Sequence, residues 1–559
     1  MDKGEREESM RREIQDQVKL KARRRRHKAH LQKAIRDMDE CELDATLQGQ
    51  HSSDADRSTS TGVLEEHAQT NAASGHSGDF DDPSPRKLPN SNLTPPADPI
   101  SVISKELELG GIMAYLDYTL PTIFPMYSPS LLRGGRGWLL TRIMQNEALR
   151  HIIVGISAHF LTVVPAIDSP DRMICETWTL REFKTRVLQA IVRVRQDIGD
   201  PGNWQNTARG GGLIGKVRLL ESVVHLMLLE VYRADTERWE LHLDAAAMLF
   251  RQIIDEKAAS NLQYNEENAF RSVFLEIGAT PVIDGIPSSD YTPWNADQAA
   301  FYFSALVLAA ADIISSISLH KRPRLQELHP MLLSEYESTA QFGLQLQDVF
   351  GCSTMVFLIL TDIAALDEWK RGSKQSGTFS LMQIAERGGM IEQKITEALA
   401  NFMTLPDSLS EEAIHDQSYP VQYLEGALGR RQPGISQINH IWLLAAQVYL
   451  HVVLSGWQPL APTMRKIINE AISLFQSTAT HRLHALAWPF CVVGCIAEPS
   501  QENIFRELHG SMGSTAKFGS MAVAMSVLDE FWRNRSSIDC DSLDLAACFA
   551  VLGHRVLPL

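Results

Sequence analysis

The chain has 559 residues, of which 44% are hydrophobic and 22% are charged, a composition that suffices for one large buried core or two fused cores. Its formal net charge is −15 at pH 7, which does not favour attraction of the whole protein to nucleic acid. The seven cysteines are few, odd in number and scattered, which argues against a disulfide framework and indicates buried free thiols in a reducing compartment.

The first segment, residues 1–47, is predicted to be a basic, solvated helical arm. Nine Lys or Arg and no Asp or Glu lie between Lys19 and Arg36, so removing this charge from the total (−15 − 9) leaves −24 on the rest. The first twelve residues are strongly charged and contain no apolar run, so we expect no signal peptide. The pattern indicates a basic arm on an acidic body that resides in the cytosol or nucleus.

The clearest functional candidate is a dense basic run within this arm. It comprises Lys19, Lys21, Arg23, Arg24, Arg25, Arg26 and Lys28. Such a run can be recognised by nuclear import receptors, which is the preferred interpretation, or can contact phosphates by counterion release. Direct DNA contact and a merely solvated helix face stay as alternatives, because the run supplies charge without a module that places side chains in a groove.

Residues 48–103 change character and are predicted to form a disordered linker. They are rich in Ser, Asp, Gly, Pro and Asn and poor in large apolar residues, so they bury too little surface to offset the entropy of ordering.

Residues 104–559 are predicted to form one large α-helical domain, so the fold class is all-α. Apolar residues recur at helical spacing in 219–231 and 438–452, and the segment Ala299–Ile317 is apolar on nearly every face, as expected of a central buried helix. Uninterrupted apolar runs such as Phe303–Ala311 are too short to span a bilayer, so we expect no membrane partner. Predicted helix breakers include Gly372, Gly388-Gly389, Pro433-Gly434, Pro459–Pro462 and Gly510–Gly513.

Two segments resemble ligand motifs in part. Gly210–Lys216 spells G-x-x-x-x-G-K, but Val217 follows where a P-loop needs Ser or Thr for magnesium, so a loop leading into a helix is the better interpretation. Asp79, Asp81 and Asp82 are clustered carboxylates, yet they lie in the predicted linker rather than on helices facing a cavity.

Cys491 and Cys495 are four residues apart on a predicted helix, with His484 one or two turns away, and could begin a zinc site. Their strongly apolar surroundings favour buried thiols instead. His481 and His484 are three residues apart and would be neighbours on one face of a helix, but no acidic residue lies near them to complete a ligand set. The sequence contains no G-x-S-x-G, H-E-x-x-H or G-x-G-x-x-G, so no catalytic residue is assigned and no enzymatic activity is expected.

An ordered set of segments resembles the fungal-specific transcription factor domain, the helical regulatory region that follows a six-cysteine zinc cluster in many fungal regulators. The set comprises Ile112–Tyr118, Gly135–Leu140, Ser157–His159, Trp239–Ala246, Phe303–Ser318, Val349–Cys352, Ile441-Trp442, Trp488–Cys495 and Phe531-Trp532.

This resemblance implies a nuclear transcriptional regulator, typically of biosynthetic or nutrient genes, that pairs with other regulators or with a second copy of itself. The family's zinc cluster needs two C-x2-C-x6-C motifs, whereas Cys41 is the one cysteine before residue 100, and the basic run resembles the segment that follows the cluster. A zinc cofactor is therefore expected only if a cluster precedes this sequence. The alternatives are a cofactor that pairs with a DNA-binding family member and a helical biosynthetic enzyme, and no small effector can be named.

Overall fold

The structure is a computed structural model that describes residues 99–164, 185–186, 189, 212–233, 238–260, 266–278, 293–333, 343–404, 434–537 and 543–559. Residues 36–109 and 110–559 fall into different compact units, and the body discussed below consists of the described residues from Gly110 to Leu559. The predicted boundary between linker and helical domain at 103/104 stays a prediction, since helix α2 (Pro99–Ala114) spans it.

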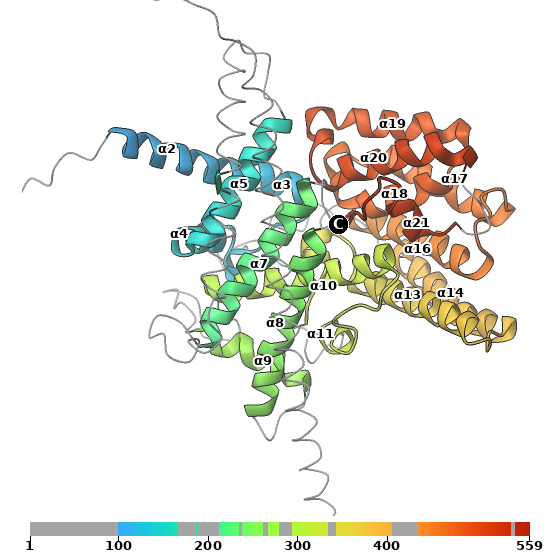
Figure 1. The fold of residues 1–559 in the computed structure, drawn as a ribbon, viewed down its shortest axis with the longest axis horizontal. Helices are drawn as coiled ribbons and strands as arrows, with labels where there is room; N and C mark the ends of the chain where they lie inside the picture. Colours follow the sequence, from blue (N-terminus) through green and yellow to red (C-terminus); the bar gives the residue numbers. More distant parts are fainter. Residues whose placement is uncertain are drawn as a thin grey trace, which may run out of the picture. The chain divides into compact units, whose positions relative to one another are not determined.

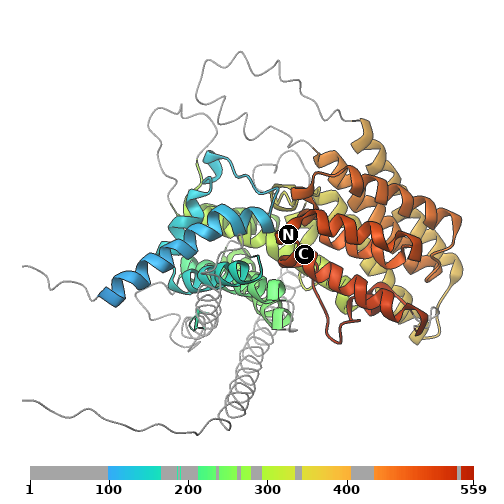
Figure 2. The same ribbon diagram turned by 90° about the horizontal axis from the view of Figure 1, so that it is seen from above.

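All regular elements of the described residues are helical, which confirms the all-α prediction (Figures 1 and 2). After α2, the first half of the body contains the π-helix Tyr115–Thr119, α3 (Leu120–Ile123), a 3-10 turn at Leu131–Arg133, α4 (Gly137–Gln145), α5 (Glu147–Val163), α7 (Leu213–Arg233), α8 (Arg238–Ser260) and α9 (Glu266–Glu276). The chain continues with α10 (Ala296–Leu319), α11 (His329–Leu332) and α12 (Gln347–Phe350).

The second half continues with longer helices and short 3-10 connections. It contains α13 (Thr354–Gln375), α14 (Leu381–Thr404), α16 (Ile435–Ser455), α17 (Pro462–Ser477), η5 (Thr480–Leu486), α18 (Ala487–Ile496), η6 (Pro499–Gln501), α19 (Glu502–Ser511), η7 (Gly513–Lys517), α20 (Gly519–Asn534), η8 (Arg535–Ser537) and α21 (Leu545–Phe549).

Helix α10 is the central element, as its all-round apolar sequence predicts. Residues 298–319 are all buried, and the helix contacts α4, α7, α8 and α9 on one side and α13 and α21 on the other (Figure 1). Its ends are defined by local chemistry: Asn295 and Gln298 form a capping box, and His320 at φ 51° ends the helix.

Among the described residues, two helices are long and apolar enough to cross a membrane, Ala296–Leu319 and Ile435–Ser455. The uninterrupted apolar runs are shorter, because Ser and Asp interrupt the first helix and Gln, Asn and His interrupt the second. Their most apolar windows are 100% and 72% buried inside the body, as expected of core helices in a large helical protein.

The two periodic segments are buried as their spacing predicts. The residues at the predicted face of 219–231 lie in α7 and those of 438–452 in α16, and all are at most 7% exposed. Helix α16 contacts α13, α14, α17 and α18, so it is the hub of the C-terminal half. Trp442 of α16 stacks on Trp488 of α18 with ring centroids 5.3 Å apart.

Three predicted helix breakers are wrong. Gly372 lies inside α13, and Gly388 and Gly389 lie inside α14. Gly388 is explained by packing rather than by a turn: a Cβ there would lie 2.5 Å from Leu454 Cδ2 of α16, so any larger residue would have to displace the Leu454 side chain. The glycine permits the close approach of two helices, with Ile384, Ile391 and Ile395 completing the buried stripe of α14.

Candidate functional site

Two of the predicted sites lie outside the described residues. They are the basic run Lys19, Lys21, Arg23, Arg24, Arg25, Arg26 and Lys28, and the carboxylates Asp79, Asp81 and Asp82. Both stay predictions.

The G-x-x-x-x-G-K segment leads into a core helix. Of its residues, Gly212 to Lys216 are described, and α7 begins at Leu213, directly after Gly212. Lys216 forms an ion pair with Glu256 of α8, and the following residue, Val217, is buried in the core. Lys216 is thus bound to a carboxylate of its own chain, which supports the interpretation as the start of a helix.

The zinc hypothesis for Cys491, Cys495 and His484 is wrong in its geometry. Both thiols are buried in α18, where the third neighbouring thiol is Cys548 of α21, while His484 lies on η5 and its ring hydrogen bonds to Thr515. No group of three or more His, Cys, Asp or Glu in the described part of the chain could hold a metal ion.

The three thiols are electrostatically coupled. Burial raises the pKa of Cys491 and Cys548 well above the ordinary value. At Cys495 burial also acts to raise the pKa, but hydrogen bonds with the Cys491 and Cys548 thiols outweigh it and lower the pKa to about 5. All three side chains are at most 2% exposed and therefore lie within the core.

A group of four charged residues forms an ion-pair seam between α4, α7 and α10. It comprises Arg142, Arg218, Glu221 and Asp297. Arg142 is fully buried, and its Nη2 and Nη1 lie 2.9 Å from Glu221 Oε2 and 3.0 Å from Asp297 Oδ1. Burial raises the pKa of Glu221, an effect that the Arg142 guanidinium opposes. The two positive and two negative side chains balance in charge, and their ion pairs connect the three helices.

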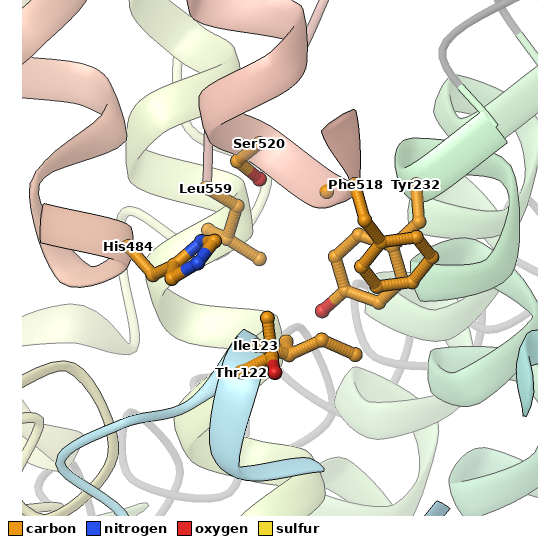
Figure 3. A pocket seen from close by; sticks show the side chains of 8 residues that line it. Thr122, Ile123, Tyr232, His484, Phe518, Ser520 and Leu559 are labelled. Atoms are coloured by element: carbon orange, nitrogen blue, oxygen red, sulfur yellow. The ribbon is translucent and has the colours of Figure 1, made fainter. Parts of the chain in front are cut away.

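A second polar group lines a small cavity at the N-terminus of α20 (Figure 3). We call it the α20 cavity, and its lining residues are Thr122, Ile123, Tyr232, His484, Phe518, Gly519, Ser520 and Leu559. They come from α3, α7, η5, the first turn of α20 and residue 559, which are far apart in sequence. The volume is about 10 Å³, close to the minimum for one water molecule.

Polar side chains enter this cavity from different sides. Figure 3 shows the Ser520 hydroxyl, the His484 ring and the Tyr232 hydroxyl directed toward the space between them. The Ser520 side chain is 93% buried (7% exposed), and its Oγ has no hydrogen-bond partner. Burial, with a smaller effect of His509, lowers the pKa of His484 to about 4, so its imidazole is neutral at pH 7.

The backbone of the α20 cavity is shaped by a left-handed glycine. Gly519 has φ 74°, a conformation that strains other residues, and it begins α20 directly after Phe518. Phe518 provides no side-chain cap and packs edge-on against Phe160, with ring centroids 5.0 Å apart. The first-turn N–H groups of α20 therefore lack the side-chain acceptor that Ser, Asp or Asn would supply at this position.

Sequence reasoning named His484 but missed Tyr232, Ser520, and the ion-pair seam. The dipeptide Gly519-Ser520 at a helix start was the one local signal for the cavity. Nothing local indicates that Tyr232, 288 residues earlier in the chain (520 − 232), lies beside it.

The chain matches the family model described as fungal specific transcription factor domain over residues 112–557. Transcription factor dibT of Pestalotiopsis microspora is 30% identical over 482 residues, which cover 84% of this chain and 72% of that protein. No solved structure shows significant similarity to the chain.

Two further relatives are described as regulators of biosynthesis. The trichothecene biosynthesis transcription regulator TRI10 of Trichoderma arundinaceum is 24% identical over 447 residues, covering 77% of this chain and 93% of that protein. The pestheic acid cluster transcriptional regulator 3 of Pestalotiopsis fici is 24% identical over 434 residues, covering 76% and 71%.

Proposed function

The chain belongs to the fungal-specific transcription factor family, and we propose that it is a transcriptional regulator of a biosynthetic gene set that acts through its helical body. The observation that carries this proposal is the family match over residues 112–557, which coincides with the body from Gly110 to Leu559. Several relatives are named for regulation of biosynthesis, trichothecene and pestheic acid among them.

The structure supplies a physical reason for the match. Segments that carry the family resemblance, such as Phe303–Ser318 and Trp488–Cys495, are buried in α10 and α18, where they contact several other helices. They are therefore elements of the packed core rather than a reactive set. The residues that carry the family resemblance are thus those that pack the helical body.

Nuclear action is part of the proposal. Transcription regulators act on DNA in the nucleus, and the basic run Lys19–Lys28 supplies the charge density that import receptors recognise. Replacing Arg23 to Arg26 with Ala in a fluorescent fusion is expected to abolish nuclear accumulation. Unchanged accumulation would remove the basic run from the proposal while leaving the family membership intact.

The family's zinc cluster does not fit the cysteines of the body. The described cysteines are Cys352, Cys491, Cys495 and Cys548, which are buried in the core and lack the paired C-x2-C-x6-C spacing.

A second candidate function is a cofactor that pairs with a DNA-binding family member. It is supported by the coverage of TRI10, since the region aligned with this chain makes up 93% of that regulator. Purified chain that retards promoter DNA by itself would favour direct DNA binding. Retardation that needs an added zinc-cluster protein would favour the cofactor.

Deletion of the gene tests the proposed function directly. Transcripts of one biosynthetic gene set are expected to change together, and reintroduction of the intact coding sequence is expected to restore them. A transcriptome without any coordinated biosynthetic set among its changes would overturn the proposal.

A further inference from the structure

We propose that Cys495 and Cys548 form a reversible disulfide when hydrogen peroxide oxidises them, and that this bond links α18 to α21. The inference goes beyond the regulatory function, because it concerns a modification site in the helical body and does not depend on which genes the protein controls. It rests on three buried thiols that meet in the C-terminal half of the body, where Figure 1 shows both helices.

The first support is the contact between thiols of two different helices. Cys491 and Cys495 lie on α18, whereas Cys548 lies on α21, 53 residues after Cys495 (548 − 495). The Cys495 thiol hydrogen bonds with both of the other thiols. The fold therefore brings together two sulfur atoms from distant parts of the chain, as a disulfide between helices requires.

Helix geometry selects Cys548 rather than Cys491 as the partner of Cys495. Residues four apart on an α-helix hold their Cβ atoms about 5–6 Å apart, whereas a disulfide needs about 3.5–4.5 Å between them. A bond between Cys491 and Cys495 would therefore have to unwind α18. This part of α18 is held in place, because the Gly494 carbonyl accepts a hydrogen bond from Trp532 Nε1 at 2.9 Å. Cys548 lies on another helix and can approach Cys495 without such unwinding.

The second support is a positive charge near Cys495. The Arg535 Nη2 is buried and has no hydrogen-bond partner in the described part of the chain. Burial acts to raise the pKa of Cys495, but the hydrogen bonds with the two neighbouring thiols and the Arg535 charge outweigh it. A thiolate is the form of cysteine that attacks an oxidant. Since burial raises the pKa of Cys548, Cys495 is the thiol that reacts first.

The two steps of the reaction balance in atoms and electrons. The Cys495 thiolate attacks one oxygen of hydrogen peroxide, the O–O bond breaks, and hydroxide leaves as the sulfenic acid forms and takes up a proton as water. The Cys548 sulfur then attacks the Cys495 sulfur, the S–O bond breaks, and the hydroxyl leaves with the Cys548 proton as a second water. Two electrons pass from the sulfur atoms to the peroxide. In a reducing compartment cellular thiols reverse the bond.

The oxidant reaches the thiols through local opening of α21. The three cysteine side chains are at most 2% exposed. Helix α21 has five residues, and residues 550–555 after it are half-buried or exposed. A helix this short makes few hydrogen bonds of its own, and such elements open far more often than the whole protein unfolds. Oxidation is therefore expected to be slower than that of an exposed thiol and to proceed in the folded protein.

The test treats the full-length, reduced chain with a small excess of hydrogen peroxide and maps its disulfides by mass spectrometry without reduction. Proteolytic cleavage before Asp541 and Asp544 separates Cys548 from Cys540, so the two can be told apart. We expect a linked peptide pair that carries Cys495 and Cys548 and that disappears with dithiothreitol. In C495S and in C548S no such pair can form.

Cys352→Ser is the matched control. Cys352 is likewise a fully buried free thiol, and its sulfur donates to the Ser353 carbonyl at 3.9 Å. This variant is expected to form the Cys495–Cys548 disulfide at the wild-type rate.

Arg535→Gln tests the role of the positive charge. Disulfide formation is expected to be severalfold slower than in wild type, with the same product, because the charge that favours the Cys495 thiolate is lost. The deficit should be largest at low pH, where the Cys495 thiol of the variant is protonated. A purely structural role of Arg535 would leave the pH dependence of the rate unchanged.

Three results would overturn the proposal: no linked Cys495–Cys548 pair after peroxide treatment, a dominant disulfide between other cysteines, or a linked pair that forms only after the helical circular dichroism is lost. The last result would show that the unfolded chain reacts and the folded protein does not. Because the disulfide is mapped in wild type, misfolding of a cysteine variant cannot produce the expected result.

Discussion

The ion-pair seam and the α20 cavity are both polar regions inside an apolar body, and they differ in whether their side chains pair with one another. In the seam, Arg142 contacts Glu221, Asp297 and Gln145, and charges of opposite sign balance. In the α20 cavity, Ser520 has no partner and the first turn of α20 has no cap. The comparison teaches that the charges of the seam connect three helices, although Glu221 Oε1 lacks a partner, whereas the Ser520 hydroxyl forms no such connection.

The largest effect is expected from breaking the seam. Arg142→Ala leaves Glu221 buried without its guanidinium, which typically costs about 3–5 kcal/mol of unfolding free energy. Urea unfolding of the variant measures this cost. The double variant R142M/E221L replaces the pair by apolar groups and should recover most of the loss, whereas equal instability of both variants would contradict the role of the uncompensated charge.

A pH-dependent effect is expected from the α20 cavity. Burial holds the pKa of His484 at about 4, below its ordinary value of 6.5, so the folded protein binds fewer protons than the unfolded chain between these values. Above pH 6.5 His484 therefore has no effect on the free energy of unfolding through its protonation. As the pH falls from 6.5 toward 4, protonation of the unfolded chain lowers this free energy by about 3 kcal/mol in total. His484→Gln should flatten the urea-midpoint profile between pH 7 and 4.5.

His225 and His242 provide the internal reference for that measurement. Burial lowers both pKa values to about 4 as well, so wild type and H484Q share their acid destabilisation. Parallel pH profiles for the two proteins would show that His484 is protonated as readily in the folded state as in the unfolded chain.

The smallest effects come from a matched pair of serines, one in each region. Ser222, beside the seam, accepts from Asn146 at 2.9 Å and donates to the Arg218 carbonyl at 3.1 Å, so S222A should cost about 1 kcal/mol. Ser520 has no partner to lose, so S520A should stay within about 0.5 kcal/mol of wild type. Thermal unfolding distinguishes the two, and an equal loss would erase the contrast.

Much of the fold is predictable from local patterns. The apolar periodicity of 219–231 and 438–452 places α7 and α16, and the all-round apolar segment Ala299–Ile317 places the central helix. Helix burial follows from these patterns, because the spacing of apolar residues determines which face avoids water. The ordered family segments also indicate the family, which the match over 112–557 shows.

Glycine is where local reasoning failed most clearly. Gly372, Gly388 and Gly389 predict breaks by propensity, yet all three lie within helices. At Gly388 the reason is tertiary, since Leu454 of α16 occupies the space that a Cβ would need. Helix propensity is a weak effect of about 1 kcal/mol per glycine, which packing readily outweighs.

The sequence by itself determined the helical class, the central helix, the acidic body with its basic run and the family. Only the tertiary structure decided that Tyr232, His484 and Ser520 share one cavity, and that Arg142 meets Glu221 and Asp297. Periodicity reports which face of a helix is buried but not which distant helix covers it. That choice depends on how the side chains of many helices fit together.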